Sequence, residues 1–183
     1  MKTTPRKSHT SENKIYFWTA TIHKWYNLLE PDNRKGIIIN SLKTLSDKEL
    51  ITVYAFVIMP NHIHLIWQLN AKNGKESVKG SFMKFTAHEF KSHLKFTDEL
   101  EKYKVAAHNK AYEFWQRDSL GIEIWNREVA RQKLDYIHRN PVSTKWLLAK
   151  DDISYYYSSA KYYEFGIDDF GFLNNLYNVF DGD

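Results

Sequence analysis

The chain has 183 residues, of which 43% are hydrophobic and 16% aromatic, and this suits a single domain with a substantial core. Cysteine is absent, which excludes disulfides and thiolate metal sites, and the sequence has no run of 18 apolar residues that could span a membrane. The formal net charge of +4 is compatible with a polyanionic partner but does not require one. The first residues lack the apolar stretch of a signal peptide, so we expect a cytoplasmic protein.

The first half of the chain has the patterns of three strands and one helix. Residues 14–25 are rich in aromatic and β-branched side chains, which is typical of a strand. Residues 32–45 place apolar side chains at helical spacing. Residues 50–59 form an almost continuous apolar run, as expected of a strand buried on both faces. A Pro-Asn pair then breaks the run, so we predict residues 62–69 as the second strand of a hairpin.

The second half predicts a helix at 81–96, a short helix at 99–110 and a strand at either 113–116 or 122–125. Residues 127–140 then predict a helix that begins after an asparagine cap and ends before a proline. The resulting order is strand, helix, strand, strand, helix, strand, helix. This order indicates an α+β protein of the ferredoxin-like class, in which a split β-α-β sheet carries the helices.

The helix expected at 81–96 has two stripes of side chains along its length. One is apolar and consists of Met83, Ala87, Phe90 and Leu94, and it is expected to face the core. The other is basic and consists of Lys84, His88, Lys91 and Lys95. A basic stripe is either a solvated helix face or a surface that contacts phosphates, and the pattern leaves both interpretations open.

Two histidines stand two residues apart in the strand expected at 62–69. Side chains alternate along a strand, so His62 and His64 should point to the same face and could share one divalent ion. The spacing alone has little specificity in a chain with 8 histidines. The context is more informative, because the pair lies in the most apolar part of the chain, where buried imidazoles need partners.

The helix that ends before Pro141 brings a phenol, a carboxamide and cations together. Asn140 follows Tyr136 by four residues and Lys133 precedes it by three, so the three side chains should share one side of the helix, with Arg139 beside them. A phenol can attack a DNA phosphate and later leave, which conserves the bond energy in a phosphotyrosine. Two imidazoles and the Asn140 carbonyl would suit Mg²⁺ or Mn²⁺, which polarises the phosphate. The alternative is structural, because most of the 12 tyrosines must simply pack.

Several segments resemble HUH single-tyrosine transposases, and in particular their REP-associated tyrosine transposase branch. The segment YAFVIMPNHIHLIW at 54–67 is similar to the histidine–hydrophobic–histidine signature. KLDYIHRNPV at 133–142, followed by YYYSSAKYY at 155–163, is similar to the tyrosine region of that branch. FWQRDSLGIEIWN at 114–126 resembles the stretch before the tyrosine helix. The combination spans about residues 14–165 in the right order and is more specific than the histidine pair alone.

This resemblance implies a DNA endonuclease and strand transferase that depends on Mg²⁺ or Mn²⁺. It would nick and rejoin single-stranded DNA beside a hairpin through a 5′-phosphotyrosine intermediate. By motif position the nucleophile falls on Tyr136 and the metal ligands on His62, His64 and Asn140. Related transposases often have glutamine at the position of the third ligand.

The same resemblance sets our expectations for domains and partners. We expect a flexible polar arm at 1–13, a transposase-like catalytic domain at 14–165 and a C-terminal extension at 166–183. The partner would be single-stranded or hairpin DNA, without a membrane or a nucleotide cofactor, and the protein would be a monomer or a homodimer. The residues expected to contact phosphates are Lys84, Lys91, Lys133 and Arg139.

Three alternatives to this function remain open. The first is a catalytically inactive hairpin-DNA-binding protein on the same fold, although the intact site residues argue against it. The second is a metallohydrolase of small phosphoesters that uses water, and it would keep most of its activity in Tyr136→Phe. The third is an RNA-binding ferredoxin-like domain, which would expose aromatic side chains on its sheet, whereas the strands predicted here are buried on both faces.

Overall fold

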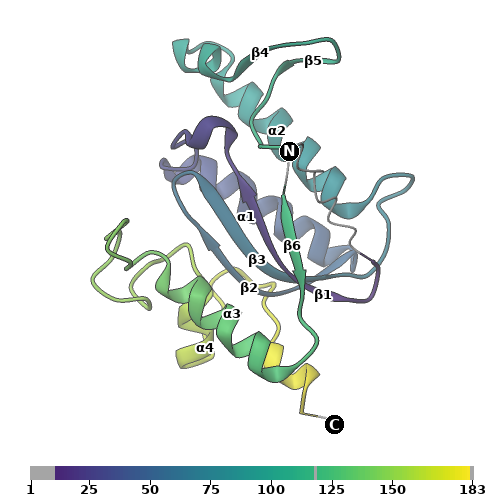
Figure 1. Ribbon diagram of the computed structural model, residues 1–183, viewed down its shortest axis with the longest axis vertical. Helices are drawn as coiled ribbons and strands as arrows, with labels where there is room; N and C mark the ends of the chain where they lie inside the picture. The colour runs from purple at the N-terminus through teal and green to yellow at the C-terminus, as the bar shows by residue number, and fades with distance from the viewer. Residues whose placement is uncertain (1–10, 118, 182–183) are drawn as a thin grey trace, which may run out of the picture.

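The computed structural model describes residues 11–117 and 119–181. Most of the arm expected at 1–13 lies outside the described residues. In the described part of the chain the centre of the fold is a four-stranded antiparallel sheet with the spatial order β2-β3-β1-β6 (Figure 1). Its strands are β1 (Ile15–Thr21), β2 (Ile51–Ile58), β3 (His62–Leu69) and β6 (Leu120–Glu123). Because β3 lies between β1 and β2, the sheet contains the split β-α-β arrangement, and the predicted α+β ferredoxin-like class is confirmed.

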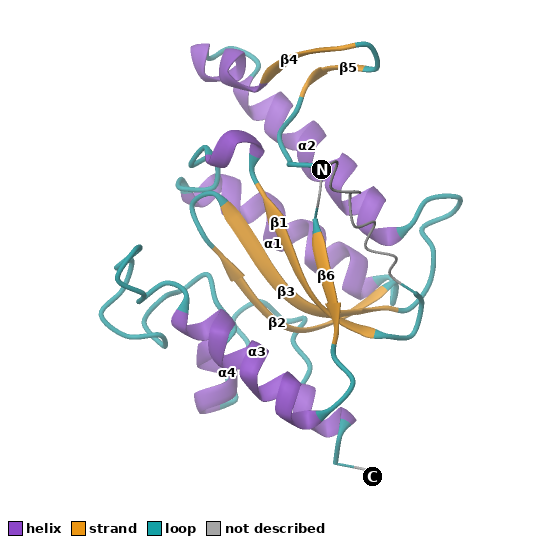
Figure 2. Cartoon of the chain, in the orientation of Figure 1, coloured by secondary structure: helices purple, strands orange, loops and turns teal. Residues whose placement is uncertain are grey.

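Helices cover both faces of this sheet (Figure 2). On one face lie α1 (Asp32–Asp47) and α2 (Val78–Leu94), and on the other lie α3 (Arg127–Arg139) and the short α4 (Ala160–Phe165). The two layers follow from the alternation of side chains along the strands. Trp18 and Trp67 stack at 4.9 Å under α1 and α2, while Phe17 and Ile66 face α3.

The continuous apolar run predicted as a buried strand is indeed buried on both faces in β2. Its register shifts at Tyr54, because Val53 pairs with Trp67 whereas Ala55 pairs with Ile66. Such an extra residue is a β-bulge. It keeps Phe56 in the layer of α1 and α2 and Ala55 in the layer of α3.

Other predicted elements need correction. The strand expected at 14–25 ends at Thr21, since the chain turns through a 3-10 segment, η1 (His23–Trp25), in which Lys24 and Trp25 have left-handed backbones. The helix expected at 99–110 is wrong. That stretch forms η2 (Asp98–Tyr103), a 3-10 helix, and the start of a hairpin made by β4 (Lys104–Ala107) and β5 (Lys110–Tyr112).

The prediction of a strand at 122–125 is confirmed in part by β6, while 113–116 contributes an isolated bridge, between Ile22 and Trp115. The apolar stripe predicted for α2 is also corrected. Phe90 and Leu94 are buried, but the inward side chains before them are Phe82 and Thr86, one residue earlier than Met83 and Ala87.

The segment after residue 165 returns to the edge of the sheet at β2. Leu173 forms a parallel bridge with Val53, and the Asn174 amide donates to the Val53 carbonyl at 2.9 Å. Phe172 is buried in the layer of α1 and α2, and Leu176, which begins η3 (Leu176–Val179), is buried in the layer of α3. These contacts cover a strand edge whose backbone groups would otherwise be open to other strands.

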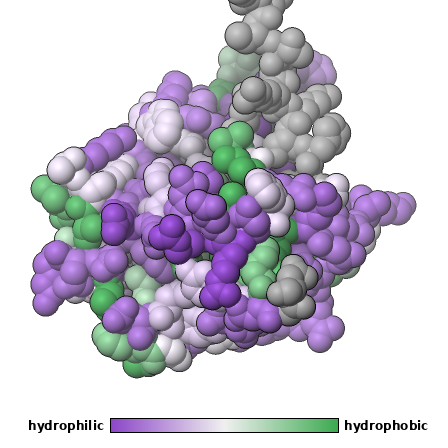
Figure 3. Space-filling model, turned by 60° about the horizontal axis from the view of Figure 1, so that its bottom comes forward, coloured by the Kyte–Doolittle hydropathy of each residue, from purple (hydrophilic) through white to green (hydrophobic). Residues whose placement is uncertain are grey.

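The surface on the side of α3 and α4 is largely hydrophilic, with apolar side chains scattered over it (Figure 3). None of the helices in the described part of the chain has the length and apolar character needed to cross a membrane.

Candidate active site

His62 and His64 lie at the start of β3 on the face that α3 covers, as predicted from their spacing. Their ring centroids are 4.7 Å apart and the ring planes are inclined by 74°. Both side chains are buried, with exposed fractions of 7% and 4%. The strand therefore holds two imidazoles side by side, close enough to bind the same ion.

Each imidazole has a hydrogen-bond partner at Nδ1. The His62 Nδ1 donates to the side-chain oxygen of Asn61 at 2.7 Å, since an amide oxygen can only accept. The His64 Nδ1 lies 2.7 Å from the hydroxyl of Thr19 on β1, which can accept the proton in the same way. Both interactions leave the Nε2 lone pair available, which is the usual arrangement for a metal-ligating histidine.

His64 Nε2 has no hydrogen-bond partner among the described residues, although the atom is buried. A buried polar atom without a partner is costly, and a metal ligand is one of the roles that explains it. Two imidazole nitrogens and a neutral oxygen form a donor set that accepts Mg²⁺ or Mn²⁺ and that could also take Zn²⁺. The residues present therefore fit a divalent ion.

Burial keeps both imidazoles uncharged at neutral pH. It lowers the pKa of His62 to about 4, with a further contribution from the positive charge of Lys145. Burial also lowers the pKa of His64 to about 3, and the charges of His62 and Lys133 act in the same direction. Since a histidine binds metal only in its neutral form, both side chains are ready to bind without first losing a proton.

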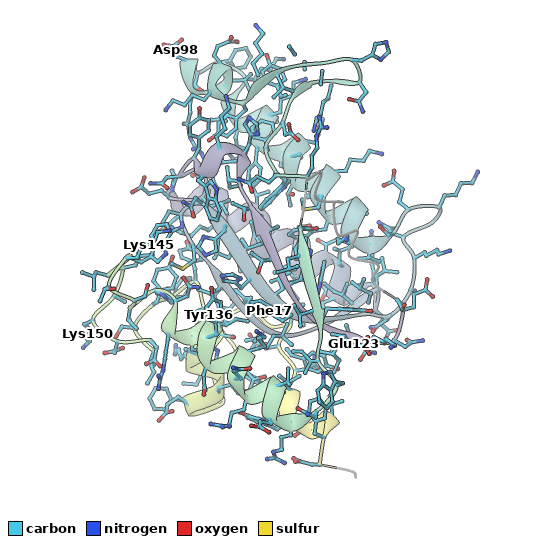
Figure 4. The ribbon with its side chains drawn as sticks, viewed as in Figure 1. Phe17, Asp98, Glu123, Tyr136, Lys145 and Lys150 are labelled. Carbon is cyan, nitrogen blue, oxygen red and sulfur yellow. The ribbon has the colours of Figure 1, made fainter. Side chains whose placement is uncertain are left out.

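Tyr136 points from α3 toward this pair. Its ring centroid lies 5.2 Å from that of His64 and 5.8 Å from that of Phe17 on β1 (Figure 4). About half of the side chain, 51%, is exposed. The buried face of α3 fixes this position, because Ala130, Leu134 and Ile137 are packed against the sheet.

The predicted N-cap of α3 is also confirmed. The side chain of Asn126 accepts a hydrogen bond from the Val129 amide at 2.8 Å. At the other end, Asn140 is the C-cap and keeps a helical backbone, with φ −57° and ψ −47°, although a proline follows. Its side chain is therefore held on the helix and lines the same cleft as Tyr136.

A cleft of about 830 Å³ opens between the sheet and α3. Six of the eight predicted site residues line it, and these are His62, His64, Lys133, Tyr136, Arg139 and Asn140. The described residues contain no group of three His, Cys, Asp or Glu side chains that could hold an ion together. Two carboxamides line the cleft, those of Asn140 and Gln116, and either could supply a neutral oxygen as a third protein ligand.

The other two predicted residues, Lys84 and Lys91, lie on α2, on the opposite face of the sheet. Lys84 forms an ion pair with Glu76 at 2.8 Å, and the Lys91 amino group lies 5.2 Å from the centre of the Tyr112 ring. The structure does not bring them to the cleft, and a contact of theirs with DNA stays a prediction.

Sequence reasoning missed several residues of the site. Thr19, Trp25, Lys145 and Trp146 line the cleft, and Asn61 supports His62 from outside it. A signal existed for Asn61, because it immediately precedes the first histidine, and for Thr19, because it lies two residues after Phe17 and so shares its face of β1. Lys145 and Trp146 belong to an irregular segment after α3, where no periodic pattern could indicate a direction.

Fold and cleft together define a ferredoxin-like α+β protein in which a buried histidine pair faces a tyrosine-bearing helix. No protein-family model and no curated protein matches the chain. Among solved structures, a REP-associated tyrosine transposase bound to a REP hairpin is similar with a TM-score of 0.63 and 16% identity, over 94% of this chain and 93% of that one. A protein from Deinococcus radiodurans R1 described as a transposase has a TM-score of 0.44 and 14% identity, over 75% of this chain and 95% of that one. The chain thus has the fold of a REP-associated tyrosine transposase.

Proposed function

We propose that this protein belongs to the REP-associated tyrosine transposases and that it nicks and rejoins single-stranded DNA beside a hairpin. The observation that carries the proposal is the meeting of His62, His64 and Tyr136 in one cleft, with ring centroids 4.7 and 5.2 Å apart. The fold shared with a transposase bound to a REP hairpin supports the choice of hairpin DNA as substrate.

His62 and His64 would hold a divalent ion, Mg²⁺ or Mn²⁺, with Asn140 as the third protein ligand. When bound, this ion would polarise the phosphate of the DNA and offset the charge that develops on it. Asn61 and Thr19 would orient the two imidazoles through their Nδ1 atoms.

Tyr136 would supply the nucleophile. Its phenol loses a proton, and the oxygen attacks the phosphorus of a phosphodiester to form a new oxygen–phosphorus bond. The bond to the 3′ oxygen of the preceding nucleotide breaks, and that oxygen takes up a proton to become a free 3′-hydroxyl. A 3′-hydroxyl can later attack the phosphotyrosine, which releases the phenol and restores the DNA backbone. No nucleotide triphosphate is consumed in either step.

Cations of the cleft would position the DNA. The Lys133 amino group lies 5.1 Å from the centre of the Phe17 ring, and Phe17 itself contacts both His64 and Tyr136. Lys133 and Arg139 lie on the same helix as Tyr136 and line the same cleft, so they would contact phosphates near the attacked one.

The direct test is trapping of the covalent intermediate. Hairpin oligonucleotides with single-stranded flanks are incubated with the protein and Mn²⁺, and adducts are separated under denaturing conditions. We expect an adduct with the wild type and none with Tyr136→Phe, whereas Tyr156→Phe, a control at an exposed tyrosine outside the cleft, should form it normally. Binding without any adduct would indicate an inactive DNA-binding protein, and cleavage that persists in Tyr136→Phe would indicate a hydrolase that uses water.

A further inference from the structure

Two tryptophans lie near His62 at the cleft. Trp25 comes from η1 and Trp146 from the segment after α3, and both line the cleft. Their ring centroids lie 6.3 and 5.7 Å from that of His62. Trp25 is exposed over 54% of its surface, while Trp146 is partly buried.

A single cation lies against both indoles. The Lys145 amino group is 5.8 Å from the centre of the Trp25 ring and 5.3 Å from the centre of the Trp146 ring. Its charge also reaches His62, where it contributes to the lowered pKa. Lys145 is labelled in Figure 4, in the loop at the end of α3. The cleft therefore has two flat apolar surfaces with a positive charge at both of them.

The exposed position of Trp25 is held by the backbone. Lys24 and Trp25 have φ values of 52° and 59°, a left-handed conformation that costs free energy in residues with side chains. The Trp25 amide donates to the Ile22 carbonyl at 2.9 Å, and the Asn61 side chain donates to the Trp25 carbonyl at 3.2 Å. Asn61 also accepts from His62, so the indole and the imidazole are fixed by the same side chain.

These features indicate what kind of ligand the two indoles of the cleft would bind. In the free protein the exposed Trp25 ring gains little from burial, while the backbone that holds it is strained. The ring is therefore suited to contact a ligand. A planar partner suits the indoles, and the nearby ammonium suits an anion. A nucleotide supplies both groups, because its base is flat and its phosphate is charged. Only an unpaired base offers its face, since bases in a duplex are already stacked on their neighbours.

We propose that Trp25 and Trp146 bind one unpaired nucleobase of the single-stranded flank next to the phosphate that Tyr136 attacks, and that Lys145 contacts the phosphate of this nucleotide. The inference rests on the proposed function and deepens it, because it assigns a site for the nucleotide beside the cleavage position. It also implies that the DNA on this side of the cleft is single-stranded.

The test is an abasic scan. Binding is measured in chelator, so that no cleavage occurs, with hairpin oligonucleotides in which one abasic position is moved along the single-stranded flanks. For the wild type we expect one position, or two adjacent ones, at which loss of the base weakens binding by about 5- to 150-fold. Pairing that flank into a duplex should weaken binding by a similar factor.

The variants then assign the effect to the indoles. Trp25→Ala and Trp146→Ala should bind the intact oligonucleotide more weakly and show little further loss of affinity when the sensitive position is abasic. Trp25→Phe should keep most of the affinity for the intact oligonucleotide. Trp125→Ala removes an indole that is 71% exposed but lies outside the cleft, and it should behave as the wild type. Melting temperatures of all variants identify any that fail to fold.

The inference is overturned if every flank position is equally tolerant in the wild type, if the alanine variants keep the same sensitive position, or if the wild type binds none of these oligonucleotides. The proposed function fails separately. A protein that shows the sensitive position but forms no adduct with Mn²⁺ would retain the stacking site without the chemistry, and an adduct without a sensitive position would retain the chemistry alone.

Discussion

Asn61 contacts two parts of the candidate site at once, although it belongs to neither a strand nor a helix. Its side-chain oxygen accepts from His62, and its side-chain nitrogen donates to the backbone of Trp25. Partners of this kind fix the tautomer and the orientation of a metal-ligating ring. One short polar side chain therefore sets the direction of the His62 lone pair and the place of the neighbouring indole.

Replacing Asn61 should therefore weaken metal binding. We expect Asn61→Ala to lower the affinity for Mn²⁺ by about 10- to 100-fold, because His62 loses the acceptor of its Nδ1 proton. Isothermal titration calorimetry measures this directly. Asn70→Ala, which removes side-chain hydrogen bonds at the far end of β3, is the matched control and should leave the affinity unchanged. An unaltered affinity in a folded Asn61→Ala protein would contradict this role.

The residues of the candidate site divide by whether a local pattern could indicate them. His62 and His64 could be predicted to share a face because a strand has period two, and Tyr136 and Asn140 because a helix places residues four apart on one side. In the structure all four of these residues line one cleft. Trp25 and Lys145 could not be predicted, since their places depend on a left-handed turn and on an irregular segment.

Among the elements, α3 decides where the phenol lies. Its N-terminus is capped by Asn126, and its middle is packed against the sheet. Near its C-terminus the buried His138 forms a hydrogen bond with the hydroxyl of Ser159 at 2.9 Å. Ser159 is also hydrogen-bonded to the backbone of Phe56 on β2. The helix is thus tied to the sheet at the turn that carries Tyr136.

Loosening this packing should lower the stability of the fold. We expect Ile137→Ala, which removes a fully buried side chain beside Tyr136, to lower the free energy of unfolding by about 2–5 kcal/mol. Gln132→Ala, on the exposed side of the same helix, should change it by less than about 0.5 kcal/mol. Urea denaturation measures both. A loss in Ile137→Ala no larger than that of the control would show that α3 does not depend on this contact.

Long periodic elements could be predicted from the sequence, and short ones could not. The hairpin of β2 and β3 and the helices α1 and α3 lie within one or two residues of the prediction. The failure at 99–110 has a physical reason. Leu100 and Tyr103 are buried three residues apart, which imitates a helix, whereas the following β4 and β5 are too short and too exposed to show an alternating pattern.

On the scale of the whole molecule, the sheet separates two layers with different tasks. The layer of α1 and α2 holds the larger share of the apolar core, including the stacked Trp18 and Trp67. The layer of α3 holds the cleft and buries polar groups that the other layer lacks, among them His62, His64 and His138. These histidines make the stability of the fold sensitive to pH.

The sign of this dependence follows from their pKa values. Burial lowers the pKa of His62 and His138 to about 4 and that of His64 to about 3, while an unfolded histidine titrates near 6.5. Below pH 6.5 the unfolded chain therefore binds more protons than the folded one, and stability falls as the pH decreases toward 4. Each histidine contributes at most about 1.4 kcal/mol per pH unit in this range.

Urea denaturation in chelator, from about pH 7 to about pH 5, should therefore show a clear loss of stability. The variant with His62→Gln and His64→Gln should show a smaller loss, because two of the three buried titrating rings are gone. Equal losses in the variant and in the wild type would mean that the histidines of the cleft do not remain neutral.

His64 on β3 and Tyr136 on α3 lie together within one chain, and this has a consequence for mixtures of two inactive variants. In the proposed mechanism each copy would use its own His64 and its own Tyr136, so a protein with His64→Ala should not be complemented by one with Tyr136→Phe. We expect such a mixture to form no DNA adduct at any ratio. Recovery of the adduct would mean that α3 is exchanged between two copies, so that the Tyr136 of one molecule acts in the cleft of the other.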